Sequence, residues 1–169
     1  MARISIVGTS GSGKSTVGRA AAERLGVPFL ELDSLRHQAN WEELPDDEFR
    51  ARTAEVVAGE GWVVDGNYSA VRRVVRERAT QIVWLDLPRW RVMLQVVPRT
   101  LVRVALRREL WNGNRERWRN LFTLDPLESI IMWAWTTHGR RRREYAGEVD
   151  DTWVRLRSRR EVKAWLDSL

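Results

Sequence analysis

Cysteine is absent from this chain of 169 residues, and lysine occurs only twice, at positions 14 and 163. The lack of cysteine excludes disulfides and thiolate metal sites. The two histidines, His37 and His138, have no metal-ligand spacing, so oxygen ligands and magnesium are expected at any metal site. No apolar run reaches the roughly 18 residues of a membrane helix, and "MAR" leads at once into a short strand. We therefore expect a cytoplasmic protein without membrane association.

Basic residues are abundant, and nearly all of them are arginine. The chain carries 29 lysines and arginines against 23 acidic residues, a net charge of +6, and 27 of the 29 are arginines. A genome-wide bias toward arginine codons is one explanation. Because the guanidinium fork also pairs well with oxyanions, the charge predicts anionic partners without choosing between nucleotides and nucleic acid.

Strands alternate with helices along the whole chain. Short apolar runs predict buried strands over 3–8, 28–33, 62–66, 81–87 and 152–158. Helical patterns lie between them, over 14–25, 46–58, 70–78, 88–110, about 126–147 and 159–168. This alternation predicts a single α/β domain over 1–169, in which helices cover both faces of a parallel sheet. Pro98 falls inside one helical pattern and is expected to kink or split it.

Three of the predicted strands end in an aspartate, namely Asp33, Asp65 and Asp86. In open α/β sheets, ligands bind at the carboxyl ends of the strands. These carboxylates are therefore candidates for a functional site. The alternative is a structural role, in which each carboxylate accepts hydrogen bonds from loop amides.

The stretch "GTSGSGKST" matches the pattern G-x-x-x-x-G-K-[ST], between a predicted strand and a predicted helix. In this pattern, glycines let backbone N–H groups approach phosphate oxygens, and the helix adds its positive end. Lys14 is expected to reach the β- and γ-phosphates and the Ser15 hydroxyl to bind Mg²⁺. The predicted binding site for ATP is made of Gly8, Thr9, Ser10, Gly11, Ser12, Gly13, Lys14, Ser15 and Thr16. A lysine in so arginine-rich a chain supports this prediction, because a compact ammonium fits inside such a loop and a guanidinium does not.

With this loop in place, the chain resembles the adenylate kinase-like P-loop kinases. The resemblance rests on the loop, "LELDSL" at 30–35, Trp41, "WVVDGNYSAVR" at 62–72 and "VWLDLPRW" at 83–90. Within that superfamily, the chain looks most similar to the small bacterial topology modulation proteins. The resemblance implies the three-layer P-loop fold with the sheet order 2-3-1-4-5 and a helical, arginine-rich lid.

The resemblance also implies roles for two strand-end carboxylates. Asp65 matches the aspartate that holds Mg²⁺ in these kinases, and Asp86 is its rival, with capping of the following helix as the other explanation. Asp33 lies where related small-molecule kinases have a carboxylate on the acceptor side. It is expected to accept the acceptor's proton, to orient the acceptor or to assist magnesium.

Further residues of the acceptor and base sites follow from the same resemblance. Trp41 and Tyr68 are candidates for stacking on the acceptor, with burial in the core as the alternative. Asn67 and Arg72 follow the "DG" turn, where nucleotide kinases grip the acceptor phosphate, but the gap to Arg72 is longer here. Arg159 opens the last helix, in the region that lies along the adenine.

An arm over approximately 99–125 is the expected lid. Arg99, Arg103 and Arg107 recur at i, i+4 and so share one face of the predicted helix. They are candidates to stabilise the charge that develops during phosphoryl transfer, with a solvated basic face as the alternative. The turn "WNGN" at 111–114 suits a lid tip, and Trp111 and Trp118 beside it also suit single-stranded nucleic acid.

These observations predict a Mg²⁺-dependent kinase that transfers the γ-phosphoryl of ATP to a nucleoside, a nucleotide or a similar small acceptor. The expected catalytic residues are Lys14, Asp33, Arg103 and Arg107. Two other functions stay open: a nucleotide-dependent switch or ATPase without a small-molecule acceptor, and a nucleic-acid-associated factor.

Overall fold

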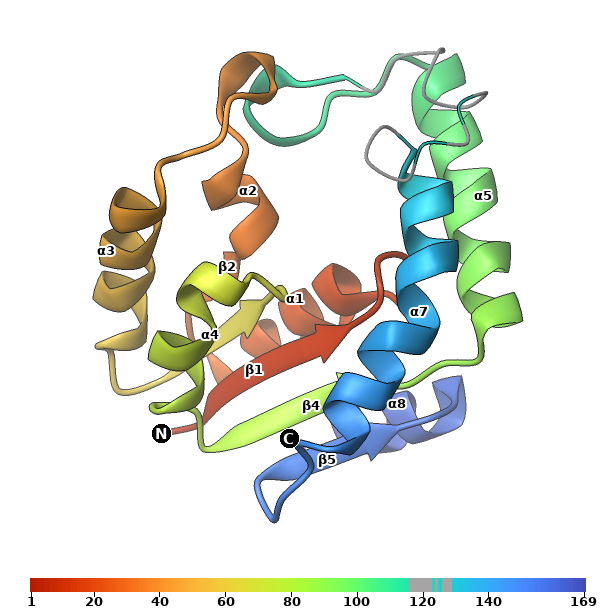
Figure 1. Cartoon of the computed structure of the whole chain (residues 1–169). Helices are drawn as coiled ribbons and strands as arrows, with labels where there is room; N and C mark the ends of the chain where they lie inside the picture. Colours follow the sequence, from red (N-terminus) through yellow and green to blue (C-terminus); the bar gives the residue numbers. More distant parts are fainter. Residues whose placement is uncertain (116–122, 124, 126–128) are drawn as a thin grey trace.

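A computed structural model describes residues 1–115, 123, 125 and 129–169 of the chain (Figure 1). Within these residues, five parallel strands form one sheet in the order β2-β3-β1-β4-β5. The strands are β1 (Arg3–Gly8), β2 (Phe29–Glu31), β3 (Trp62–Asp65), β4 (Gln81–Leu85) and β5 (Trp153–Leu156). The predicted α/β class and the order implied by the family resemblance are thus confirmed.

Helices connect the strands and follow the predicted pattern, except for α2, which was not predicted. They are α1 (Lys14–Leu25), α2 (Leu32–Arg36), α3 (Asp46–Val57), α4 (Ser69–Arg76), α5 (Arg89–Ala105), α7 (Ile130–Ala146) and α8 (Arg159–Asp167). Two 3₁₀ turns, η1 (Ala39–Trp41) and η2 (Trp111–Gly113), lie in the connections. No helix in the described part of the chain is both long and apolar enough to span a membrane.

The sheet is covered on both faces, as the apolar strands require (Figure 1). On one face, Ile4 and Ile6 of β1 pack with α1 and α8 in a core where both isoleucines are at most 2% exposed. On the other face, α3 and α4 cover β3, and Tyr145 of α7 packs on β4. Helix α5 packs against α7 rather than on the sheet. The carboxyl ends of the neighbouring strands β2, β3 and β1 therefore lie side by side at the same end of the sheet.

The second strand is shorter than predicted. It ends at Glu31, and Asp33 lies in the first turn of α2 instead of at a strand end. The strand is at the edge of the sheet and pairs only with β3, so little holds it extended. The Ser34 hydroxyl donates to the Glu31 carbonyl at 2.7 Å, which favours the turn into α2.

The arm helix also differs from the prediction. Helix α5 continues through Pro98 without being split. Because proline has no N–H, the helix lacks the hydrogen bond to the carbonyl of Leu94. Leu94 is 67% exposed, so water can take the place of the missing donor. The helix ends at Ala105, and Arg107 adopts the left-handed conformation with φ 46°. Arg107 therefore does not share a helix face with Arg103.

Candidate phosphate and acceptor sites

The predicted phosphate loop connects β1 to α1 and has the backbone that its glycines permit. Gly11 and Gly13 have φ values of 81° and 95°, a region that disfavours other residues. A Cβ atom on Gly11 would lie 2.9 Å from Cβ of Val96, so this loop packs too closely on α5 to accept a side chain. The loop shape thus depends on glycine both for conformation and for space.

The loop folds back toward its own start and surrounds the beginning of α1. The Ser12 amide donates to the Thr9 carbonyl at 3.1 Å, and Lys14 Nζ lies 3.5 Å from the same oxygen. Ser12 Oγ is buried and has no hydrogen-bond partner. The first N–H groups of a helix have no partner within the helix and carry its positive end. Together with the Lys14 ammonium, they form an arrangement suited to an anion.

Two carboxylates from neighbouring strands lie beside this loop. Glu31, the last residue of β2, accepts a hydrogen bond from the Ser15 hydroxyl at 2.9 Å and pairs with Arg19 at 3.3 Å. Asp65 ends β3 and is 2% exposed, and within the described part of the chain its Oδ2 has no hydrogen-bond partner. Burial raises the pKa of Asp65 to about 6, although the charge of Lys14 acts in the opposite direction. Such a carboxylate lacks a partner that a bound cation can supply.

The rival carboxylate, Asp86, is already paired. It accepts from Arg155 at 2.6 and 2.9 Å and lies 3.1 Å from Arg142 Nε. Arg155 also lies over the ring of Trp84, 4.3 Å from its centre. Asp86 is thus held by two arginines instead of capping α5, whose N-terminus at Pro88 has no side-chain cap. Of the two aspartates, Asp65 is the one whose carboxylate has an unused oxygen.

The side chains after the "DG" turn have partners within the protein. Asn67 accepts from the Gly8 amide at 3.3 Å and donates to the Gly8 carbonyl, so it braces the start of the phosphate loop. Arg72 lies 2.5 Å from a Glu144 oxygen and lines a small cavity of about 20 Å³ with Tyr68. Both residues were expected on the acceptor side; in the structure, Asn67 contacts the loop and Arg72 contacts α7.

Asp33, in the first turn of α2, takes part in a chain of polar contacts. Tyr68 donates its hydroxyl proton to Asp33 Oδ1 at 2.7 Å, and the same hydroxyl lies 3.2 Å from Nε2 of His37. The Tyr68 ring packs edge-on against Phe49 with centroids 5.3 Å apart. Burial, and then the charge of Asp33, raise the pKa of Tyr68 well above its usual range. Tyr68 is therefore expected to remain a hydrogen-bond donor to Asp33.

Trp41 and the segment 111–115, which we call the arm turn, contact each other. The Trp41 amide donates to Asn114 Oδ1 at 2.8 Å, and its indole N–H donates to the Arg115 carbonyl at 3.3 Å. Trp41 is 37% exposed, and its ring lies edge-on to His37. The predicted turn is confirmed as a 3₁₀ turn with Asn112 at φ 54°, but its side chains contact α2 and η1.

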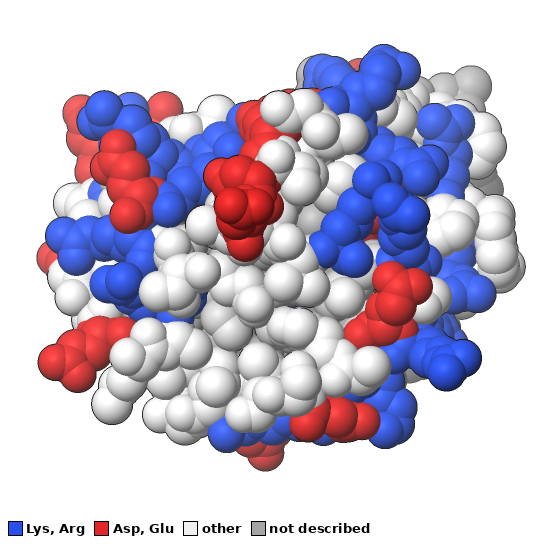
Figure 2. Space-filling model, turned by 90° about the horizontal axis from the view of Figure 1, so that it is seen from below, with Lys and Arg blue, Asp and Glu red and all other residues white. Residues whose placement is uncertain are grey.

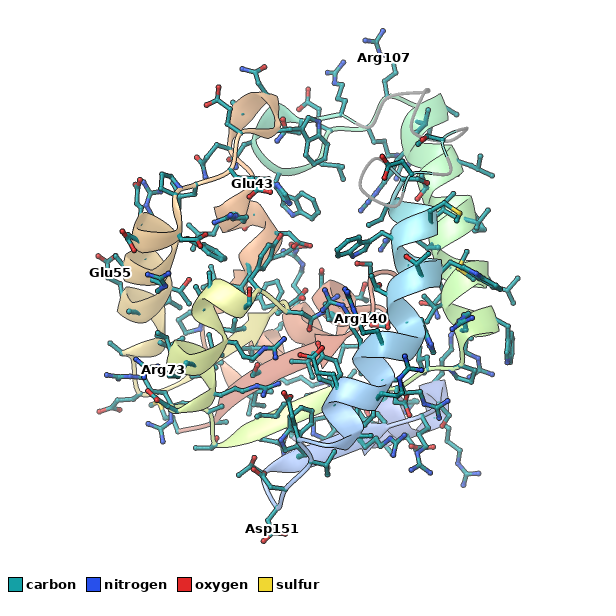
Figure 3. All side chains as sticks on the ribbon, viewed as in Figure 1. Glu43, Glu55, Arg73, Arg107, Arg140 and Asp151 are labelled. Atoms are coloured by element: carbon teal, nitrogen blue, oxygen red, sulfur yellow. The ribbon has the colours of Figure 1, made fainter. Side chains whose placement is uncertain are left out.

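The other predicted arm residues lie along α5 and beyond its end. Arg99 and Arg103 line a hollow of about 510 Å³ together with Arg108. Arg107 is exposed and lies at the top of Figure 3, at the end of α5 farthest from the sheet. Trp118, like most of 116–128, lies outside the described residues. Because α5 ends before Arg107, the expectation that Arg103 and Arg107 share one helix face is wrong.

Arg159 begins α8, the helix that follows β5, and is exposed. The preceding Ser158 caps the helix: its hydroxyl accepts from the Glu161 amide at 3.2 Å and donates to the Glu161 carboxylate at 2.8 Å. This cap fixes where the chain turns from β5 into α8. It leaves the side chain of Arg159 on the surface.

Basic residues do not gather into one stripe on the face seen from below. There, blue and red side chains alternate around an uncharged centre (Figure 2). Several arginines are also paired with carboxylates, among them Arg36 with Glu43 and Asp46, and Arg76 with Glu148. Charge that is neutralised in this way contributes little to attracting a nucleic-acid backbone.

A family model described as shikimate kinase matches residues 10–110. A shikimate kinase of Symbiobacterium thermophilum is 38% identical over 98 residues, 49% of this chain and 56% of that protein. A shikimate kinase of Corynebacterium glutamicum is 31% identical over 96 residues, 49% of this chain and 57% of that protein. The chain thus spans a little over half the length of these relatives.

Solved structures share the fold over nearly the whole chain. A gluconokinase from Sinorhizobium meliloti aligns with a TM-score of 0.55 and 23% identity over 99% of this chain and 92% of that one. Shikimate kinase from Bacteroides thetaiotaomicron aligns with a TM-score of 0.57 and 16% identity over 99% of this chain and 95% of that one. At these identities, the likeness concerns the fold.

These matches bear on the resemblance drawn from the sequence. They agree with the adenylate kinase-like P-loop superfamily, but they do not support the narrower resemblance to topology modulation proteins. The family match covers the phosphate loop from Ser10 onward, both carboxylates beside it and Asp33. The chain belongs to the shikimate kinase family.

Proposed function

We propose that this protein is a kinase that transfers the γ-phosphoryl group of ATP to a hydroxyl of a small acceptor. The observation that carries the proposal is the arrangement at one edge of the sheet. There, a glycine-dependent phosphate loop lies beside Glu31 and Asp65, and Asp65 Oδ2 has no hydrogen-bond partner among the described residues; Asp33 is held one turn further on. A phosphate-binding loop alone would suit any nucleotide-binding protein. A further carboxylate such as Asp33, placed to meet an acceptor, suits phosphoryl transfer.

On the donor side, the loop amides and Lys14 bind the triphosphate. The Lys14 ammonium lies within the loop and is expected to move from the Thr9 carbonyl to the β- and γ-phosphates when ATP binds. Asn67 holds the Gly8 backbone from both its N–H and its C=O, which keeps the loop open in advance of binding. Such preorganisation lowers the cost of ordering the loop around the nucleotide.

The residues beside the loop fit a magnesium ion. Ser15 Oγ, the Glu31 carboxylate and the orphaned Oδ2 of Asp65 are hard oxygen ligands. Among the described residues, no group of three acidic or histidine side chains forms a metal site alone, which agrees with a Mg²⁺ ion that keeps water and phosphate ligands. When bound, the ion would neutralise charge on the β- and γ-phosphates.

On the acceptor side, Asp33 is the proposed base. As the acceptor oxygen forms its bond to the γ-phosphorus, the bond from that phosphorus to the β–γ bridging oxygen breaks and ADP leaves. The hydroxyl proton passes to the Asp33 carboxylate and from there to water. Tyr68 bonds only Oδ1 of Asp33, so the other carboxylate oxygen can accept that proton.

The relatives favour a polyhydroxylated carboxylic acid as the acceptor. The curated relatives are named shikimate kinases, and the similar solved structures include a shikimate kinase bound to shikimate and a gluconokinase. Shikimate and gluconate both carry a carboxylate and several hydroxyls. We therefore place such acids before the nucleosides and nucleotides that the sequence analysis considered.

The test is ADP formation by the purified protein with Mg²⁺-ATP and a panel of acceptors. The panel contains shikimate, gluconate, nucleosides, nucleoside monophosphates and simple polyols. We expect at least one hydroxy acid to raise ADP release well above the rate with water alone, and the Lys14→Ala variant to abolish the increase. Phosphorylated product identified by mass spectrometry assigns the acceptor.

Two other outcomes have distinct signatures. ADP release that no acceptor accelerates would favour a nucleotide-dependent switch or ATPase and refute the kinase proposal. Tight binding of DNA or RNA that weakens steeply with salt would favour a nucleic-acid factor.

A further inference from the structure

Asp33 is connected to the arm turn (residues 111–115) through two side chains. Tyr68 donates to Asp33 at 2.7 Å, and because its one hydroxyl proton is used there, its oxygen can only accept from His37. The 3.2 Å contact then requires the proton of the His37 ring to be on Nε2. His37 Nδ1 is buried and has no hydrogen-bond partner among the residues that the structure describes, which agrees with a nitrogen that carries no proton.

The His37 ring is itself fixed by tryptophans on two sides. Trp111 of the arm turn stacks on it, with centroids 5.9 Å apart and planes 28° apart. Trp41 meets it edge-on, with centroids 5.6 Å apart. A ring in contact with two indoles has few orientations, so its Nε2 is aimed at Tyr68. The orientation of His37 therefore depends on whether Trp111 is in place.

Two asparagines hold the arm turn against this region. The Asn112 amide donates to the carbonyls of Ser34 and His37, and the Asn114 amide donates to the Gln38 carbonyl at 2.7 Å. Asn114 is 4% exposed and also accepts from the Trp41 amide. These bonds join parts of the chain that are 73 to 78 residues apart in sequence.

From these contacts we propose that Tyr68 and His37 are positioning residues for Asp33, and that the docked arm turn keeps them aligned. The proposal rests on the proposed kinase function, in which Asp33 is the base. A carboxylate that is free to rotate would spend much of its time misaligned with the acceptor hydroxyl, and misplacement by about 1 Å can cost as much as 100-fold in rate. Docking of the arm thus prepares the acceptor side.

The first test uses substitutions that separate the hydroxyl from the packing. Tyr68→Phe keeps the ring against Phe49 and removes the bond to Asp33. Tyr145→Phe is the matched control: Tyr145 is the only other tyrosine, is 1% exposed and, among the described residues, accepts one long bond, from Arg141 at 3.4 Å. With the acceptor from the panel, we expect Tyr68→Phe to lower kcat about tenfold with KM for ATP within about twofold, a smaller loss than removal of the base itself.

Substitutions at His37 separate its hydrogen bond from its stacking. His37→Gln keeps an N–H near the position of Nε2 and should retain kcat within about threefold, whereas His37→Phe keeps a ring and should lose about as much as Tyr68→Phe. Equal kcat values for Tyr68→Phe and Tyr145→Phe would overturn the positioning role. So would full activity of His37→Phe.

A second measurement needs no acceptor. The chain has only two histidines, so ¹⁵N-histidine spectra are assignable with a His138 variant. We expect His37 to carry its proton on Nε2 in the wild type, and Asn112→Ala to shift its ring signals. A proton on Nδ1, or ring signals unchanged by both Asn112→Ala and Tyr68→Phe, would overturn the proposal. A wild type without acceptor-dependent turnover would instead refute the kinase function, and the positioning role with it.

Discussion

Replacing Asp65 by asparagine should stabilise the protein relative to the wild type, by an amount that grows with pH. Burial raises the pKa of the Asp65 carboxyl from its ordinary value of 3.8 to about 6. The folded protein thus binds this proton more tightly than the unfolded chain does. The contribution of Asp65 to stability is greatest below pH 4, falls as pH rises through 4 to 6, and is constant above that window.

The size of the effect follows from the shift. A rise from 3.8 to about 6 is roughly two pKa units, and each unit corresponds to about 1.4 kcal/mol, so the change is on the order of 3 kcal/mol. Asparagine mimics the protonated carboxyl at every pH. Its unmet N–H groups subtract a constant amount, which cancels when the difference between variant and wild type is compared at two pH values.

The assay is urea unfolding of both proteins at pH 4 and pH 7.5, without metal or nucleotide. The advantage of Asp65→Asn should increase by about 2.4 kcal/mol between the two values, because part of the full effect is already present at pH 4. Asp86→Asn is the matched control: that carboxylate is as buried but is held by Arg142 and Arg155, so its loss should destabilise the protein. Because both arginines are partly exposed, about 1–3 kcal/mol is expected, below the cost for a fully buried pair. A pH-independent difference for Asp65→Asn would refute the reasoning.

Three further predictions concern the phosphate loop and the Glu31 carboxylate beside it. Lys14→Arg should lose at least about 100-fold in kcat with an unchanged melting temperature, because the guanidinium does not fit where Nζ approaches the Thr9 carbonyl; activity within tenfold would contradict this. Gly11→Ala should lower stability by about 1–3 kcal/mol in chemical unfolding, since its Cβ would overlap Val96 and its φ is 81°; an unchanged midpoint would count against it. Glu31→Gln should raise the Mg²⁺ concentration for half-maximal ADP formation about tenfold, and an unaltered magnesium titration would show that Glu31 does not serve the metal.

Local patterns predicted the loop proposed to bind phosphate and its flanking elements well. The phosphate loop, β1 and α1 are contiguous in sequence, and the spacing of the residues from Gly8 to Thr16 is itself the motif that predicts the loop. The strand order required the family resemblance in addition, because spacing alone does not decide which strands are neighbours. Asp65 was placed correctly at the end of β3 for the same local reason.

The acceptor side could be predicted only in part, because it depends on distant contacts. Asp33 was expected at a strand end, but the edge strand stops at Glu31, so the residue beside Ser15 is Glu31 instead. The acidic residue two positions earlier in "LELD" was the available signal. No local pattern indicates that Asn112 would bond to carbonyls of α2, or that Trp111 would stack on His37.

The comparison of Asp65 with Asp86 explains why the structure was needed to choose between them. Both follow buried strands, both are at most 5% exposed, and the sequence allowed either one to hold a metal. Asp86 meets two guanidinium groups, so its charge is balanced in the folded chain. Among the described residues, Asp65 has an oxygen without a hydrogen-bond partner and a raised pKa, so its charged form lowers the stability of the folded protein. Since folding alone favours the balanced arrangement, the unbalanced carboxylate beside the phosphate loop is the one better explained by function.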